Sequence, residues 1–165
     1  MNYSSIKEFF YKLYNICLLM MFLPAGAFLV VYYLTLTGKI SPVIQTEKVQ
    51  LIILVSFPVL AILDLTIVHW VVRKRFLGLQ KEISLGIRLE KYFSIASIRI
   101  SAIVATSLFM AAGLYLTGHE YFTVYFLLIL GWLYVQWPSP KRVSKDLELR
   151  GDEEKMVLTK GEAFK

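Results

Sequence analysis

Residues 49–72 read VQLIILVSFPVLAILDLTIVHWVV, and this long apolar stretch indicates the fold class. Asp64 is its single formally charged residue. A helix needs about 20 consecutive apolar residues to cross the hydrocarbon layer of a bilayer, because each residue adds about 1.5 Å. We therefore interpret residues 49–72 as a membrane-spanning helix.

Three more apolar stretches complete the pattern, at about residues 13–37, 93–117 and 121–137. The last of these is at the lower limit of length for a span. Helices are expected rather than open sheets, because lipid offers the backbone no hydrogen-bond partners. The 165-residue chain has a mean hydropathy of +0.60 and is 57% hydrophobic. The sequence thus predicts an all-α membrane protein, a four-transmembrane-helix bundle in residues 1–138 followed by a charged tail in residues 139–165.

The distribution of lysine and arginine predicts the orientation. Fifteen of these eighteen residues precede the first span, lie between the second and third spans, or belong to the tail. Only Lys39 and Lys48 lie in the other loops, and Arg99 lies inside the third span. Basic residues concentrate on the cytoplasmic side of membrane proteins, so both termini and residues 73–92 are expected in the cytoplasm. Because the chain shows no organelle address, a bacterial inner membrane is the expected location.

Two segments outside the predicted spans leave more than one structure open. Apolar residues between Phe76 and Ile87 follow a helical period, whereas those between Ile83 and Leu89 alternate as in a strand. We favour helical extensions of the second and third spans that meet at a turn. Pro138 and Pro140 are expected to end the fourth helix. The tail has mixed charges and two interior glycines, which predicts partial order at best.

Asp64 and Arg99 are the two charges within the predicted spans. Asp64 lies eight residues before Val72 and Arg99 seven residues after Tyr92, which places them about 12 and 10 Å inside the same boundary. A lone charge at this depth costs at least a few kcal/mol, and bidentate hydrogen bonds between carboxylate and guanidinium relieve that cost. We therefore predict an ion pair between the second and third helices. It has either a structural role in helix registry or a role in transport, with Asn15, Thr106 and Gln136 as polar lining.

The sequence lacks the motifs that are typical of catalytic or cofactor-binding sites. The sequence contains no HExxH, GxSxG, Walker or GxGxxG motif. Cys17 is the one cysteine, and His69 and His119 are expected on opposite sides of the membrane, which argues against a haem or metal site. We expect no catalytic residue, metal or cofactor.

The positions of the small and the basic residues predict which molecules the protein contacts. Small side chains recur on two faces of residues 97–113, which favours close helix contacts. Anionic lipid headgroups are the expected partners of basic residues at the ends of spans, here Arg73, Lys74, Arg75, Lys141, Arg142 and Lys145. We predict a non-enzymatic assembly or interaction subunit that binds membrane lipid and either a second copy or a partner membrane protein, but no nucleic acid. The alternatives are a small oligomeric transporter or channel that uses Asp64 and Arg99, and a lipid-modifying enzyme.

Overall fold

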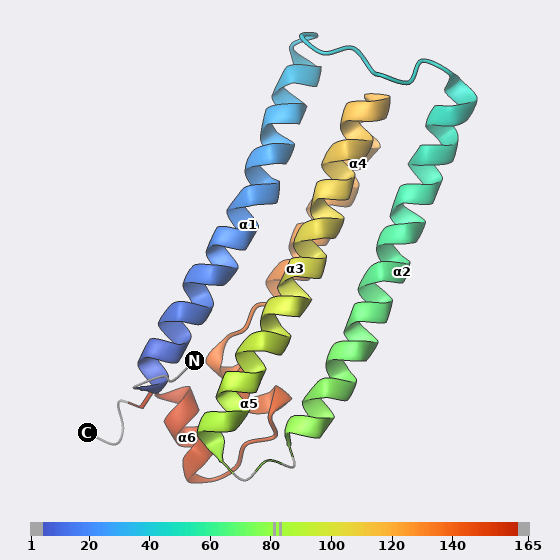
Figure 1. Ribbon diagram of the computed structural model, residues 1–165. Helices are drawn as coiled ribbons and strands as arrows, with labels where there is room; N and C mark the ends of the chain where they lie inside the picture. The colour runs from blue at the N-terminus through green and yellow to red at the C-terminus, as the bar shows by residue number, and fades with distance from the viewer. Residues whose placement is uncertain (1–4, 81, 83, 162–165) are drawn as a thin grey trace. The chain divides into compact units, whose positions relative to one another are not determined.

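The structure is a computed structural model that describes residues 5–80, 82 and 84–161. Helices account for the regular structure in this part of the chain, and it contains no strand. The prediction of an all-helical chain is confirmed. The helices, labelled in Figure 1, are α1 (Ile6–Leu36), α2 (Glu47–Leu79), α3 (Leu85–Thr117), α4 (Tyr121–Val135), α5 (Pro140–Asp146) and α6 (Asp152–Leu158).

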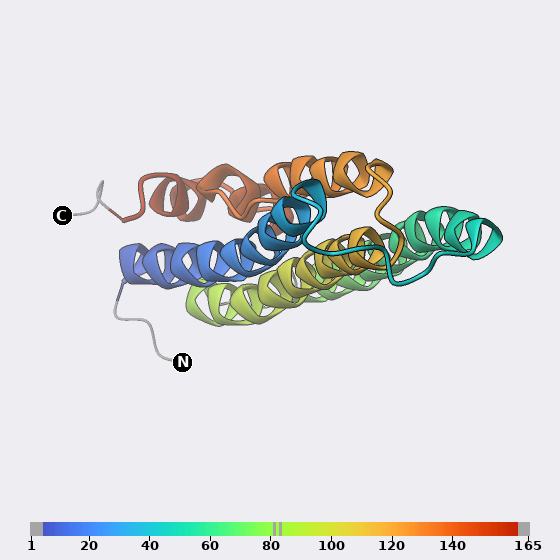
Figure 2. The same cartoon turned by 90° about the horizontal axis from the view of Figure 1, so that it is seen from above.

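Three helices are long and apolar enough to cross a membrane. They are α1, α2 and α3, with 31, 33 and 33 residues. Figure 2 shows α1, in blue, as one continuous helix. Helix α2 has an 18-residue apolar window of which only 6% is buried, and the corresponding share of α1 is 17%. Such exposed apolar helices are typical of proteins whose solvent is lipid. The chain therefore has the helices of a membrane protein.

The predicted fourth span is shorter than its predecessors. Helix α4 has 15 residues, which is about 22 Å of rise against roughly 30 Å of hydrocarbon. It reaches the composition and length of a span only together with α5, from which it is separated by a bend of 74°. Pro140 occupies the start of α5, where its missing N–H costs nothing, and Ser139 Oγ accepts a hydrogen bond from the Arg142 N–H at 3.3 Å. The described chain thus contains three helices that are long and apolar enough to cross a membrane, or four candidates if α4 and α5 are counted as one.

Residues 73–92 adopt the helical alternative over the part that the structure describes. Helix α2 continues to Leu79 and α3 begins at Leu85. The Arg88 N–H donates to the Ser84 carbonyl at 3.0 Å, which starts α3. The rings of Phe76 and Tyr92 stack at 5.1 Å between centroids, so that the two helix ends pack against each other.

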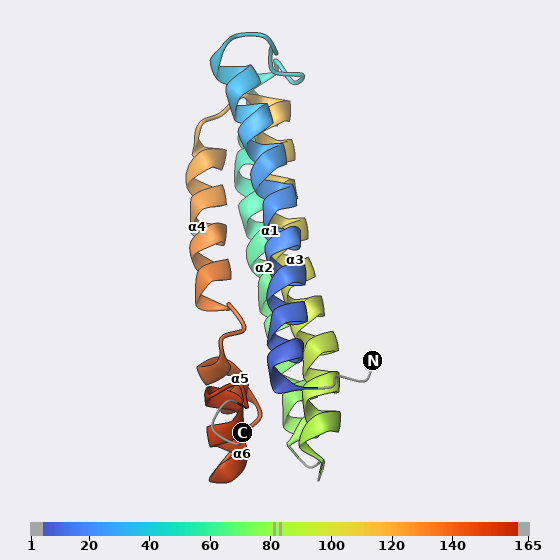
Figure 3. The ribbon, with the colours of Figure 1, turned by 90° about the vertical axis from the view of Figure 1, so that its left-hand side faces the viewer.

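The chain divides into two compact units. We call residues 1–18, 69–99 and 137–165 the tail unit, and residues 19–68 and 100–136 the apolar unit. In the tail unit, α5 and α6 pack against each other (Figure 3) and bury Val143, Leu147 and Val157. The tail is therefore helical at 140–146 and 152–158, where the sequence predicted only partial order.

In the apolar unit, the hairpin of α3 and α4 depends on a small residue. The ring of Phe122 packs so closely over Gly113 that an added Cβ would overlap it. This contact agrees with the expectation that small residues on α3 allow close approach. Helix α3 is also the most buried of the three long helices, since half of its apolar window is buried.

Candidate functional site

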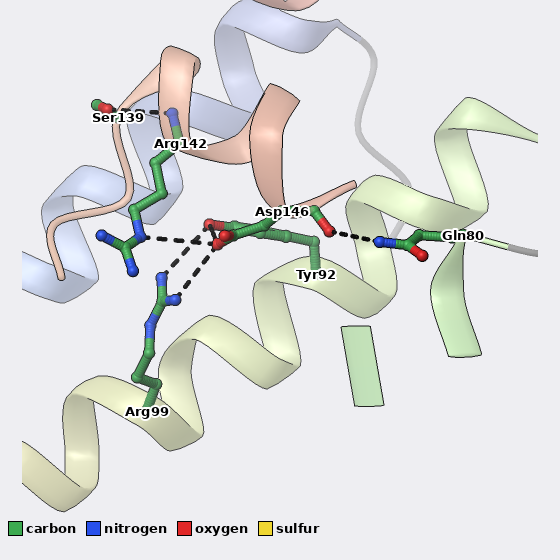
Figure 4. Close-up of polar contacts among 6 residues, drawn as sticks. All are labelled: Gln80, Tyr92, Arg99, Ser139, Arg142 and Asp146. Carbon is green, nitrogen blue, oxygen red and sulfur yellow. Dashed lines mark hydrogen bonds and ion pairs between the residues drawn. The ribbon is translucent and has the colours of Figure 1, made fainter. Parts of the chain in front are cut away.

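Arg99 is the centre of a polar cluster in the tail unit (Figure 4). Its side chain is only 5% exposed, because it belongs to the stripe of α3 that also buries Tyr92, Ala96 and Ile103. The Arg99 guanidinium donates to Asp146 Oδ2 at 3.3 Å and to the Tyr92 hydroxyl oxygen at 3.5 Å. The Tyr92 hydroxyl in turn donates to Asp146 Oδ2 at 3.2 Å. A buried cation of α3 is thus paired with a carboxylate of the tail.

Asp146 is held in this position from α2 and α5. Arg142 lies one turn earlier on α5, with its Nε 3.8 Å from Asp146 Oδ2. The Gln80 amide donates to the Asp146 backbone carbonyl at 3.5 Å. Asp146 is the last residue of α5, where the helix dipole disfavours a negative charge. The neighbouring guanidinium groups offset that cost.

A second ion pair connects α3 with the tail. Arg88 Nη2 donates to both carboxylate oxygens of Glu153 at 2.7 Å, and Arg88 is 8% exposed. Arg88 and Arg99 are eleven residues apart, which is close to three helical turns, so both lie on one face of α3. Acidic residues of α5 and α6 therefore dock the tail onto this face.

A cavity of about 410 Å³ lies beside Arg99 in the tail unit. Its cationic lining comprises Arg73, Arg99, Arg142 and Lys145, and its anionic lining comprises Asp146 and Glu148. The remaining lining residues are His69, Val72, Phe76, Leu77 and Gln80. This composition combines a cationic surface with an apolar wall.

Asp64 occupies a different site, in the apolar unit. It is exposed on α2, and Thr106 Oγ1 of α3 donates to its Oδ2 at 3.0 Å. The same hydroxyl lies 2.9 Å from the Ala102 carbonyl oxygen, and it has one hydrogen for the two acceptors. A cavity of about 240 Å³ adjoins Asp64 and is otherwise apolar except for Thr106, with Leu60, Ala61, Ala105 and Phe109 as its other lining residues.

The two residues of the predicted ion pair have different partners in the structure. Arg99 pairs with Asp146, and Asp64 is hydrogen-bonded to Thr106. Thr106 is seven residues, or about 10 Å, beyond Arg99 on the same helix. The pairing of Asp64 with Arg99 stays a prediction, whereas the ion pair observed at Arg99 uses a tail residue that the sequence analysis did not consider.

The other predicted site residues are distributed over both units. Thr106 lines the Asp64 cavity as expected. Asn15 is exposed on α1, and Gln136 is buried at the end of α4, where its backbone N–H donates to carbonyls of that helix. Neither lines the cavity of Asp64 or that of Arg99.

The six predicted headgroup contacts fall into two groups. Arg73, Arg142 and Lys145 line the Arg99 cavity. Outside it, Lys74 lies 3.6 Å from the centroid of the Trp70 ring, and Arg75 and Lys141 are exposed. Tyr92, Asp146 and the Arg88–Glu153 pair are not among the residues predicted from the sequence. Two features of the sequence point to them. Ser139 and Pro140 can start a helix in the tail, and the spacing of Arg88 and Arg99 places both on one face of α3.

Chemically, the Arg99 cavity suits an anion, and the Asp64 site suits a cation or a hydrogen-bond donor. Comparison of the chain with models of protein families, with curated proteins and with solved structures found no match.

Proposed function

We propose that the protein is a non-enzymatic assembly subunit of a membrane, which binds a partner membrane protein through α2 with Asp64 as the polar contact. In this proposal both termini lie in the cytoplasm and the membrane is the inner membrane of a bacterium. The excess of lysine and arginine in the tail unit supports that orientation.

The exposure of Asp64 carries the proposal. It lies within the apolar stretch 49–72, on a helix whose apolar window is only 6% buried. A carboxylate that faces lipid costs at least a few kcal/mol, and such residues in membrane proteins normally face a bundle interior or a partner. Within its own unit Asp64 shares one hydroxyl hydrogen with the Ala102 carbonyl. A further donor from outside the chain would complete its hydrogen bonding.

The donor is better supplied by a different protein than by a second copy. A cation compensates a carboxylate best, and Arg99 is the one lysine or arginine within the apolar stretches 13–37, 49–72, 93–117 and 121–137. Its guanidinium is buried and already paired with Asp146. The expected partner is therefore a membrane helix that carries a lysine or an arginine at the depth of Asp64.

Site-specific photocrosslinking in native membranes tests the proposal. A photoreactive amino acid replaces Ile67, which is 60% exposed and lies one turn from Asp64. We expect a crosslink to one membrane protein that disappears with Asp64→Leu and persists with Glu47→Leu, a matched change at the start of α2. Asp64→Lys should also abolish the crosslink. An acidic substitution in the partner helix that restores the crosslink to Asp64→Lys would identify the contacting position. Crosslinks to a second copy, or to lipid alone, would overturn the proposal of a different partner.

Transport is the second candidate, and the cavity of about 240 Å³ at Asp64 favours it. A single carboxylate in an apolar cavity within a span is suited to a small cation. Because Arg99 pairs with Asp146, this candidate depends on Asp64 without Arg99. Cation flux into vesicles that contain the purified protein, abolished by Asp64→Asn with assembly unchanged, would support transport over assembly.

A further inference from the structure

The cavity beside Arg99 has the size and the charge of a ligand site. Its volume of about 410 Å³ lies within the range of roughly 300–1,000 Å³ that is typical of small-ligand pockets. Four cationic side chains face two carboxylates in its lining, which leaves an excess of two positive charges. An anion is therefore the ligand that this lining favours.

Arg99 is incompletely satisfied by the protein. Its two described hydrogen bonds, at 3.3 and 3.5 Å, are longer than the usual 2.7–3.2 Å for a nitrogen donor. Its Nε is buried and has no hydrogen-bond partner within residues 5–80, 82 and 84–161. A buried guanidinium with unused donors costs free energy, and an anion with several oxygen acceptors removes that cost.

The position of the cavity indicates where such an anion would come from. The lining includes Val72 and Arg73, at the point where the apolar run of α2 changes to the basic run 73–75. In membrane proteins this change in composition falls at the level of the lipid headgroups, and basic pockets beside spans bind phosphate-bearing headgroups there. The apolar wall that Phe76 and Leu77 provide suits the glycerol part of such a lipid.

We propose that the Arg99 cavity binds the phosphate group of an anionic ligand, with Arg99 as the buried anchor and Arg73 and Lys145 at its exposed rim. A phospholipid headgroup and a free phosphate compound share this chemistry. The proposal is independent of the partner assigned to Asp64, because it uses only residues of the tail unit.

Two double variants test the site. Each replaces one arginine and one lysine with glutamine, so that both lose two positive charges. Arg73→Gln with Lys145→Gln removes two cations that line the cavity. Arg150→Gln with Lys155→Gln removes two exposed cations of the tail unit that do not line it. Both leave Arg99 in place, so that the buried cluster still folds. Circular dichroism and the midpoint of thermal unfolding verify that both proteins are folded.

Binding to the full-length protein in mild detergent is measured by native mass spectrometry, with phosphatidylglycerol, phosphatidylcholine and inorganic phosphate as separate probes. We expect the lining variant to bind phosphatidylglycerol about tenfold more weakly than the wild type, and the control variant to change by less than twofold. The same pattern with inorganic phosphate alone would assign the site to a free phosphate compound. Equal losses in both variants, or binding of none of the phosphate-bearing probes, would overturn the proposal.

Discussion

Arg99 shows how one charge organises the tail unit. A buried cation on α3 must find acceptors, and Asp146, Tyr92 and the cavity beside it provide them. The sequence was sufficient to predict that Arg99 needs a carboxylate. It was not sufficient to select Asp146, because the tail was expected to be only partly ordered and its carboxylates were therefore not considered as partners.

Removal of Asp146 tests this arrangement. Asp146→Ala leaves a buried guanidinium without its counter-ion, which typically costs about 3–5 kcal/mol. We expect the free energy of unfolding in detergent to fall by about 3 kcal/mol, as measured by denaturant titration followed by circular dichroism.

Glu148→Ala provides the matched control, since Glu148 is an exposed carboxylate two residues further along the tail. It should change the free energy of unfolding by less than about 0.5 kcal/mol. Combining Asp146→Ala with Arg99→Met should recover much of the loss, because the uncompensated charge is then absent. A similar loss for Asp146→Ala and Glu148→Ala would contradict a specific ion pair.

Among the elements, α3 has the largest structural role. It carries Arg88 and Arg99 toward the tail at one end, and Thr106 and Gly113 toward α2 and α4 at the other. The small residues of its sequence predicted close packing, and the contact of Gly113 with Phe122 shows one such approach. The choice of Phe122 as the neighbour depends on the tight turn between α3 and α4.

A pair of glycine substitutions distinguishes close packing from simple helix propensity. Gly113→Ala should lower the free energy of unfolding by about 1–3 kcal/mol, because the methyl group overlaps the Phe122 ring. Gly131→Ala on α4 meets nothing within 4 Å and should be neutral or stabilising by up to about 1 kcal/mol. Both are measured by denaturant titration in the same detergent. Equal stabilisation by the two substitutions would exclude the close contact.

At the scale of the whole molecule, the positions of lysine and arginine predict an orientation in a membrane. The charge distribution predicts that residues 38–46 face outward and the tail faces the cytoplasm. The helices α1, α2 and α3 are compatible with this arrangement by length.

Cysteine labelling of intact cells tests the orientation. In a Cys17→Ser background, exposed Ser41→Cys should react with a membrane-impermeant maleimide, whereas exposed Lys155→Cys should react only after the cells are permeabilised. Labelling of both positions from the same side would contradict the predicted orientation. Fluorescence of the labelled band on a denaturing gel provides the measurement.

Length and apolar composition were enough to predict a helical chain with several helices able to cross a membrane, and three of the four predicted stretches form such helices without a bend. The sequence also indicated that Asp64 and Arg99 are the residues to examine, since charge within an apolar stretch is visible without a fold. Their contacts became visible only in the folded chain. Thr106 lies 42 residues from Asp64 and Asp146 lies 47 residues from Arg99, and such separations are closed by packing that no local pattern records. Packing of α5 against α6 ordered the tail, and residues from α2, α3 and the tail together line the cavity beside Arg99.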